Sequence, residues 1–310
     1  MNKILITGGS GLVGSAIKSI ETNYSYEFIF LSSKDCNLTD YNATFELFNK
    51  IKPFYVIHLA AYVGGLFKNM NYKVEMLEKN LMINYNVVKC CHEVKVSKLI
   101  CCLSTCIFPD KTTYPINETM LHDGAPHNSN DAYAYAKRIL EIHCKTYQEQ
   151  YGDNFICVIP TNIYGANDNY SLNDGHVIPA LIHKCYLSKK ENKPFIVLGS
   201  GKPLRQFIYS VDLAKLIIWS LEKYEDKESI ILSVNEKDEV SIKYVATLIA
   251  KYFNQNMIEF DISKADGQYK KTADNSKLMS LIDDFQFTSI EEGIQKSVSW
   301  FESHFMTCRK

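Results

Sequence analysis

The chain has 310 residues, of which 46% are hydrophobic and 22% are charged, and its formal net charge is -1 at pH 7. This length supports one large α/β unit or two closely joined domains with a sizeable core. The bulk charge predicts neither nucleic acid nor a membrane as partner, and no apolar stretch is long enough to span a bilayer. The apolar run before the first glycines is too short for a signal peptide, so we expect a cytoplasmic protein.

The ten cysteines are expected to be mostly buried thiols. The chain is large, no secretory signal is recognised, and several cysteines, such as Cys101 and Cys102, lie in apolar runs. Residues 89–94, KCCHEV, place possible ligands side by side, which suits a tetrahedral zinc site poorly. The sequence therefore predicts no metal site.

Short runs rich in β-branched residues alternate with longer amphipathic segments. The predicted strands are 3–8 (KILITG), 26–32 (YEFIFLS), 54–60 (FYVIHLA), 98–104 (KLICCLS) and 154–160 (NFICVIP). The predicted helices are 11–21, 41–50, 69–94, 131–151 and 176–189. This alternation predicts an α/β fold, a doubly wound parallel sheet covered by helices on both faces.

Past Pro160 the rhythm changes. A loop rich in Asn, Asp and Gly at 164–175 is followed by further strands and helices, which suggests a second lobe. We expect a Rossmann-type domain formed by residues 1–165 and 206–236, and a smaller, discontinuous C-terminal lobe formed by residues 166–205 and 237–310.

The first strand leads directly into TGGSGLVGSAI, in which Gly8, Gly11 and Gly14 are three residues apart. Between a strand and a helix, such glycines permit a tight turn, close approach of a pyrophosphate and helix-on-strand packing. The alternative is an ordinary strand-to-helix turn, but the position favours dinucleotide binding. The contacts are expected from Gly8, Gly9, Ser10, Gly11, Leu12, Val13 and Gly14.

The end of the second strand is expected to meet the adenosine ribose. An acidic residue there favours NAD, whereas hydroxyls and a cation can hold a 2′-phosphate, so Ser32, Ser33 and Lys34 favour NADP. Asp35 follows at once, and a solvated loop is the alternative. Asp40 either faces the adenine or caps the next helix.

Tyr133 and Lys137 are four residues apart, which places both on one face of a helix. A lysine about 4 Å from a phenol supplies roughly 4 kcal/mol at an effective dielectric of about 20, enough to bring a Tyr pKa toward neutrality. Ser104 ends the fourth strand, where open α/β sheets place their ligands. Together with the glycine loop, Ser104, Tyr133 and Lys137 resemble the Ser-Tyr-Lys set of the extended short-chain dehydrogenase/reductase superfamily.

The resemblance narrows to the GDP-L-fucose synthase family over nearly the whole chain. It rests on residues 58–69 (HLAAYVGGLFKN), 103–118 (LSTCIFPDKTTYPINE), 160–170 (PTNIYGANDNY), 175–184 (GHVIPALIHK), 205–214 (RQFIYSVDLA) and 266–278 (DGQYKKTADNSKL). It implies 3,5-epimerisation of GDP-4-keto-6-deoxy-D-mannose, followed by NADPH-dependent reduction of the keto group. It also implies NADP as cofactor, a GDP-sugar as substrate, and a homodimer paired through helices 69–94 and 131–151.

The resemblance further implies roles for individual residues. Cys106 and His176 match the epimerase pair, whose usual pKa values of about 8.5 and 6.5 bracket neutrality. Further cofactor contacts are expected from Leu59, Ala60, Ala61, Tyr133, Lys137, Pro160, Asn162, Ile163 and His176. Substrate contacts are expected from Gly64, Gly65, Ser104, Asn162, Lys184, Leu198, Arg205, Asp266 and Lys271. On this interpretation the Gly64-Gly65 bend covers the sheet beside the sugar and nicotinamide.

Two residues depart from the family pattern. Bacterial relatives often have arginine where this chain has Ser10, so recognition of the cofactor phosphate is expected from residues 32–34. Some relatives have Trp where this chain has Leu198, which predicts weaker substrate affinity with the chemistry unchanged.

Other functions remain open from the sequence. A 4,6-dehydratase would usually carry Thr-Asp-Glu where this chain has Ser104, Thr105 and Cys106. A simple 4-epimerase would have no use for the pair of Cys106 and His176. Another nucleotide-sugar epimerase/reductase of the superfamily and a non-catalytic NADP-binding regulator are the remaining alternatives.

Overall fold

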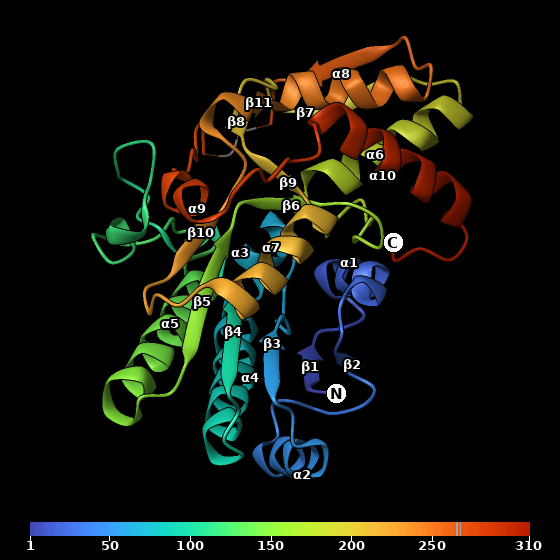
Figure 1. Cartoon of the computed structure of the whole chain (residues 1–310). Coiled ribbons are helices and arrows are strands. Elements are labelled where there is room, and N and C mark those ends of the chain that lie inside the picture. Colours follow the sequence, from blue (N-terminus) through green and yellow to red (C-terminus); the bar gives the residue numbers. More distant parts are fainter. Residues whose placement is uncertain (265, 267) are drawn as a thin grey trace.

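The computed structural model describes residues 1–264, 266 and 268–310, and its centre is a six-stranded sheet (Figure 1). The strands lie in the order β10-β5-β4-β3-β1-β2, and every neighbouring pair is parallel. Their bounds are β1 (Lys3–Thr7), β2 (Glu27–Leu31), β3 (Tyr55–His58), β4 (Lys98–Cys102), β5 (Phe155–Pro160) and β10 (Ile230–Leu232). The predicted doubly wound α/β sheet is therefore confirmed.

Both faces of the sheet are covered because its strands are apolar on both sides. One layer of helices contains α2 (Tyr41–Ile51), α4 (Lys73–Glu93) and α5 (Asp131–Tyr151), and the other contains α1 (Leu12–Ile20) and α7 (Ser210–Lys223). On β1, Leu5 packs with the first layer, whereas Ile4 and Ile6 pack with the second, as the alternation of side chains along a strand requires.

One predicted helix is wrong in its extent. The segment predicted as a helix over 69–94 forms two helices, α3 (Leu66–Asn71) and α4, because the backbone of Tyr72 leaves the helical region at φ -123° and ψ 46°. Asn and Tyr are weak helix formers, so little opposes a break there. The other four predicted helices are confirmed as α1, α2, α5 and α6 (Val177–Lys190), each within a residue or two of its predicted bounds.

The small sheets lie beyond the carboxyl ends of the strands of the central sheet (Figure 1). Three two-stranded sheets pair β6 (Asn162–Tyr164) with β9 (Phe207–Tyr209), β7 (Phe195–Leu198) with β12 (Ile258–Asp261), and β8 (Leu204–Arg205) with β11 (Val240–Ser241). Their apolar side chains join those of α6, α8 (Ile242–Tyr252) and α10 (Ile290–His304) in a third core cluster. Short helices are α9 (Ser276–Leu281), η1 (Glu21–Asn23), η2 (Thr105–Ile107), η3 (Glu118–Met120) and η4 (Glu236–Asp238).

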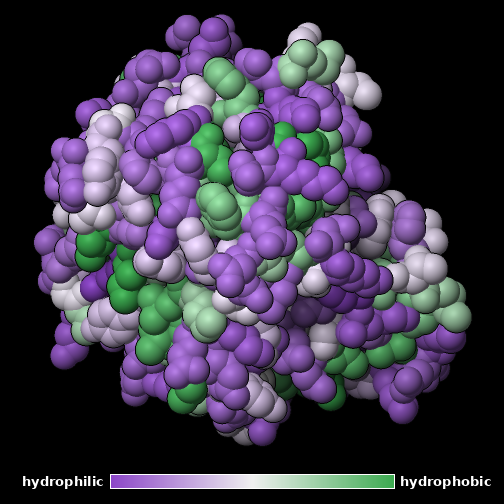
Figure 2. All heavy atoms as spheres, turned by 90° about the horizontal axis from the view of Figure 1, so that it is seen from below, coloured by the Kyte–Doolittle hydropathy of each residue, from purple (hydrophilic) through white to green (hydrophobic). Residues whose placement is uncertain are grey.

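All ten cysteines are free thiols, and seven of them are buried, as predicted. Among the helices that the structure describes, none has both the length and the apolar character needed to cross a membrane. Seen from the side of α2, the surface is mostly hydrophilic, with hydrophobic residues gathered in several groups (Figure 2).

Candidate active site

The glycine loop between β1 and α1 is a cradle in which larger residues would not fit. Gly8 has a φ of +72°, and a Cβ there would lie 2.8 Å from the backbone nitrogen of Ala60. A Cβ on Gly9 would lie 2.7 Å from Cβ of Phe30. At the start of α1, Gly11 is the N-cap, and the first turn contains no acidic residue. This geometry leaves the positive end of a helix open to an anion and fits the pyrophosphate of a dinucleotide.

The segment after β2 forms a tight exposed turn. The carboxylate of Asp35 accepts hydrogen bonds from the backbone N–H of Ser32 (2.7 Å) and from its hydroxyl (2.6 Å). These bonds lower the pKa of Asp35, so its negative charge stays beside Ser33 and Lys34. Asp40 caps α2 by accepting from the backbone N–H of Ala43, which confirms the second of its two predicted roles.

Ser104 and Cys106 follow the carboxyl end of β4. Ser104 is the N-cap of η2, and its hydroxyl oxygen accepts from the backbone N–H of Cys106 at 3.4 Å. The thiol of Cys106 is buried, which raises its pKa, while the nearby Lys271 ammonium, the Ser104 hydroxyl and Lys137 act in the opposite direction. The thiol therefore holds its proton near neutral pH, with two cations close enough to stabilise the thiolate.

Tyr133 and Lys137 lie on α5 as the spacing predicts, with the ammonium 5.9 Å from the centre of the Tyr133 ring. Lys137 is buried and donates a hydrogen bond of 2.7 Å to the carbonyl of Cys102. The expected lowering of the Tyr133 pKa is wrong for this structure. Burial raises that pKa above its usual 10.0, and the neighbouring Cys106 and Cys102 add to the increase. Burial also lowers the pKa of Lys137, which weakens the cation that would have opposed it.

A pocket beside Cys106 contains residues that the sequence analysis did not select. Its lining includes Thr105, Cys106, Asp110, Tyr114, His127, Gln268 and Lys271. Gln268 donates to the hydroxyl of Tyr114 at 3.1 Å, and within the described part of the chain its Oε1 is buried with no hydrogen-bond partner. A buried acceptor without a partner is costly, so Oε1 of Gln268 is suited to accept a hydrogen bond from a hydroxyl or amide group of a ligand.

His176 is the N-cap of α6 and directly follows the Asn/Asp-rich loop. Desolvation by the surrounding protein lowers its pKa below the usual 6.5, and the Arg309 cation adds to this, so the imidazole is neutral at pH 7. The loop before it is tied to the Gly64-Gly65 bend, because the backbone N–H of Gly65 donates to the carbonyl of Asp174 at 3.1 Å. A Cβ on Gly65 would lie 3.2 Å from the carbonyl oxygen of Gly175.

Two residues predicted to hold the GDP part of the substrate, Arg205 and Asp266, have hydrogen-bond partners within the protein. The guanidinium of Arg205 donates to the backbone carbonyls of Leu204 and Gln268, each at 2.6 Å. The carboxylate of Asp266 accepts from the backbone N–H of Ser200 (2.8 Å) and from its hydroxyl (2.6 Å). Arg205 therefore joins β8 to Gln268, and Asp266 holds the turn at Ser200.

The other predicted site residues differ in whether their side chains are hydrogen-bonded, buried or exposed. Asn162 donates to the carbonyl of Gln206 at 2.9 Å, which joins β6 to β9. Burial lowers the pKa of Lys184 on α6, and Leu198 is 48% exposed at the end of β7. Leu59 and Ala60 lie against Gly8, whereas Pro160 and Ile163 belong to β5 and β6.

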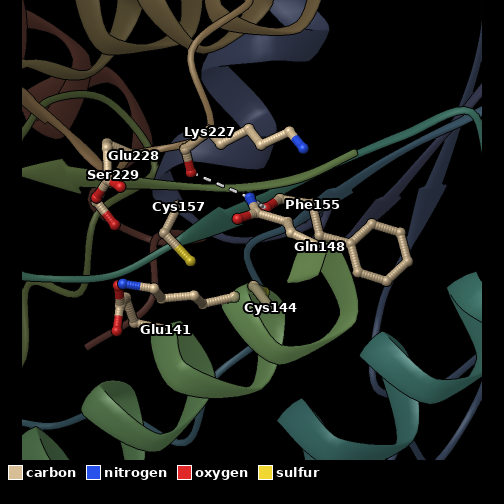
Figure 3. A pocket seen from close by; sticks show the side chains of 9 residues that line it. Glu141, Cys144, Gln148, Phe155, Cys157, Lys227, Glu228 and Ser229 are labelled. Carbon is tan, nitrogen blue, oxygen red and sulfur yellow. Dashed lines mark hydrogen bonds between the residues drawn. The ribbon is translucent and has the colours of Figure 1, made fainter. Parts of the chain in front are cut away.

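A second hollow contains none of the predicted site residues. It lies between α5 and the segment before β10, and its lining includes Cys144, Cys157, Gln148 and Lys227 (Figure 3). Gln148 donates to the carbonyl of Lys227 at 3.1 Å across it, so the hollow separates two elements that are already joined. Within the described residues, no group of three or more His, Cys, Asp or Glu side chains is arranged to hold a metal ion.

Comparison with known proteins agrees with this geometry. Residues 4–234 match the model of the NAD dependent epimerase/dehydratase family. The chain is 56% identical to the GDP-L-fucose synthase of Dictyostelium discoideum, covering 99% of this chain and 97% of the relative, and 32% identical to that of Escherichia coli K12, covering 96% of each.

A solved structure gives the same result at the level of the fold. The GDP-L-fucose synthetase from Naegleria fowleri bound to NADP superimposes with a TM-score of 0.96 at 48% identity, over 100% of this chain and 95% of that one. The chain belongs to the NAD dependent epimerase/dehydratase family and, within it, to the GDP-L-fucose synthase family.

Proposed function

We propose that this chain is a GDP-L-fucose synthase, which epimerises GDP-4-keto-6-deoxy-D-mannose at carbons 3 and 5 and then reduces its 4-keto group. The observation that carries this proposal is the identity of 56% to the Dictyostelium discoideum enzyme, which extends over 99% of the chain. The chemistry requires an oxyanion site, a proton donor and acceptor pair, and a bound reductant. The glycine loop follows β1, Ser104 and Cys106 follow β4, Tyr133 lies on α5, and His176 begins α6.

NADP is the cofactor in this proposal, because the related Naegleria fowleri structure contains NADP and the glycine cradle fits a dinucleotide. Gly8, Gly9 and the start of α1 would hold the pyrophosphate, and Ser33 and Lys34 the 2′-phosphate. Lys137 would hold the nicotinamide ribose. When bound as NADPH, the nicotinamide supplies the hydride for the reduction.

Epimerisation uses the acidity that a ketone gives to both neighbouring carbons. Ser104 and Tyr133 hydrogen-bond the C4 oxygen, so one site stabilises the enolate formed at either carbon. Inversion needs proton removal on one face of the sugar and proton return on the other. Cys106 and His176 suit this because near neutral pH the buried thiol holds a proton while the imidazole has a free lone pair.

Reduction follows in the same pocket. Tyr133 donates its phenolic proton to the C4 oxygen as hydride reaches C4, and its raised pKa keeps that proton in place until then. The positive charge of Lys137 lies near Tyr133, because its ammonium is held by a hydrogen bond to the carbonyl of Cys102. Lys271, beside Cys106, and Lys184 are the cations assigned to the diphosphate, and Gln268 is added to the substrate contacts.

A homodimer is proposed for the assembly. The outer faces of α4 and α5 have large apolar side chains that are about half exposed, including Met82, Tyr85, Ile139 and Ile142. A contiguous apolar surface on paired helices is typical of a subunit interface. The division into a Rossmann domain (1–165 and 206–236) and a substrate lobe (166–205 and 237–310) is kept as a proposal, and a cytoplasmic location stays a prediction.

The test is one incubation with GDP-4-keto-6-deoxy-D-mannose and NADPH in deuterated water, followed by absorbance and proton NMR. Stoichiometric loss of NADPH and GDP-L-fucose deuterated at carbons 3 and 5 are expected. Cys106→Ser should slow deuterium uptake. If NADPH is not oxidised and no deuterium is exchanged, the proposal is overturned in favour of another nucleotide sugar or a non-catalytic binder of NADP.

A further inference from the structure

His58 is a fully buried histidine at the end of β3, outside the set of reacting groups. It lies opposite Thr7, the residue before the glycine loop, and the two side chains are hydrogen-bonded at 2.7 Å between Oγ1 and Nδ1. Its other ring nitrogen, Nε2, is 3.0 Å from Oδ1 of Asn84 on α4. Both ring nitrogens are thus used inside the protein, in a place where an unpaired polar group would be costly.

The side chains of Thr7, His58 and Asn84 form a line of hydrogen bonds, and this line continues beyond them in both directions. At one end the backbone N–H of Ala60 donates to Oγ1 of Thr7 at 3.3 Å. At the other end Nδ2 of Asn84 donates to the carbonyl of Ala136 on α5 at 3.4 Å. Ala60 contacts the position where a Cβ on Gly8 would lie, and Ala136 immediately precedes Lys137. The line therefore connects the cofactor loop to the helix of Tyr133 and Lys137.

The direction of each hydrogen bond is fixed by its partners. The Asn84 amide turns its NH₂ toward a carbonyl, so its Oδ1 faces the ring and must accept. Nε2 of His58 then carries the hydrogen, and Nδ1 accepts from the Thr7 hydroxyl, whose oxygen accepts in turn from Ala60. Burial and the nearby Lys137 cation lower the pKa of His58 to about 3, in keeping with a neutral ring.

We propose that His58 is a positioning residue, which sets α5, and with it Tyr133 and Lys137, relative to the glycine loop that would hold the cofactor. The inference rests on the proposed reductase function and deepens it. His58 acts through Asn84 and touches neither substrate nor cofactor. A displacement of the order of 1 Å between a proton donor and a hydride donor is enough to slow a reaction about 100-fold, so one buried ring can matter at this distance.

The experiment compares four single variants and the double variant His58→Leu/Asn84→Leu under saturating substrates. His58→Leu and Asn84→Leu each cut the line, whereas His58→Gln keeps one acceptor and one donor. Ile57→Ala is the matched control, since Ile57 is equally buried on the same strand and packs on the opposite face of the sheet. The measurements are kcat for reduction and its isotope effect with NADPH deuterated at C4 of the nicotinamide.

The two leucine variants are expected to lose about 10- to 100-fold in kcat and to show a larger isotope effect, because hydride transfer becomes slower relative to product release. The double variant should be no slower than either single one, since both cut the same line. His58→Gln should stay within a few-fold of wild type, and Ile57→Ala should show an unchanged isotope effect. Additive losses, or leucine variants that behave like Ile57→Ala, would overturn the inference.

A second readout covers a variant that folds poorly or a wild type that does not reduce this substrate. Amide hydrogen exchange over residues 131–139 should quicken in His58→Gln less than in Asn84→Leu, and Ile57→Ala should leave the difference between α5 and the rest of the sheet unchanged. Equal exchange of α5 in Asn84→Leu and wild type would refute the positioning role. Failure of the proposed function would instead appear as wild-type inactivity with the exchange pattern intact.

Discussion

The buried pair of Tyr133 and Lys137 illustrates how burial can outweigh a single charge. Considered alone, a lysine one helical turn away should ease ionisation of the phenol. In the folded chain the ammonium donates to the carbonyl of Cys102, and the pKa of Tyr133 lies above its usual 10.0. The phenol is then neutral over the whole working range, which is the state required of a proton donor in a reduction.

Removing the phenolic hydroxyl tests this role directly. Tyr133→Phe should lower kcat for reduction about 100- to 10,000-fold, the range typical of a lost general acid. NADP affinity, measured by titration calorimetry, should change little, because Lys137 keeps its bond to Cys102. A matched change, Tyr135→Phe, alters a phenol on the exposed side of the same helix and should leave kcat unchanged. Equal losses in both variants would contradict the assignment.

Asp168 is a buried carboxyl in the loop that leads to His176. Its Oδ1 accepts from the backbone N–H of Asn169 at 2.7 Å, and within the described residues its Oδ2 is buried with no partner. Desolvation raises its pKa from 3.8 to about 7. Folding thus favours the protonated form, so its contribution to stability is fully present below pH 4 and is lost as pH rises through 7.

The corresponding prediction concerns Asp168→Asn, which cannot ionise. The free energy of unfolding of this variant, relative to wild type, should rise with pH by up to about 4 kcal/mol between pH 4 and pH 8, at about 1.4 kcal/mol per pKa unit. Urea unfolding at several pH values measures it. Asp174→Asn, an exposed change in the same loop, is the control and should follow wild type. A difference independent of pH would show that folding leaves the pKa of Asp168 unchanged.

At this scale the sequence predicted the residues that belong to motifs and missed those that do not. The roles proposed for Ser104, Tyr133 and Lys137 followed from strand ends and helix spacing. Gln268 and Tyr114 lie in irregular loops and meet only through long-range folding, so no periodic pattern marks them. The line through His58 was equally hidden, because a histidine within an apolar run gives no sign of its partners.

Among the elements, the glycine loop was the easiest to predict and the helix break at Tyr72 the hardest. The loop is predictable because its backbone geometry requires glycines, which can be seen in the sequence. The helix break at Tyr72 instead depends on how α3 is held by the rest of the chain. Asn69 on α3 donates to the carbonyls of Gly64 and Gly65, and Gly65 is itself bonded to the loop before His176. The start of α3 and the Gly64-Gly65 bend therefore depend on each other and on a loop more than 100 residues later, so the local sequence alone does not predict the break.

The loop itself allows a controlled test, because two glycines share nearly the same backbone conformation. Gly8 and Gly152 have φ values of +72° and +75°, but a Cβ on Gly152 meets nothing within 4 Å. Gly152→Ala should cost only the backbone strain, about 1–2 kcal/mol, and leave NADP affinity unchanged. Gly8→Ala adds a clash with Ala60 and should weaken NADP binding at least tenfold. Equal NADP affinities in the two variants would argue against a cofactor role for this loop.

For the whole molecule, five of the six strands of the central sheet followed from the sequence, but β10 and the pairing of the strands in the small sheets did not. The five strands up to Pro160 alternate with helices along the chain, so their pattern predicts a parallel sheet. The small sheets pair strands that are distant in sequence, such as β7 with β12, and two of the paired strands are only two residues long. Segments this short have no readable period, so their partners are decided by packing in the third core cluster.

The apolar outer faces of α4 and α5 lead to the last prediction, which concerns assembly. Ile139 and Ile142 are 48% and 47% exposed on α5, and burying them between subunits would recover hydrophobic free energy. Light scattering of the native protein should give twice the chain mass of 35.5 kDa. Ile139→Lys should shift the population toward the monomer, because dimerisation would bury an unpaired charge. Ile262→Lys, at a side chain 80% exposed after β12, should leave the dimer intact. A monomeric wild type, or equal disruption by both variants, would rule out this face as the interface.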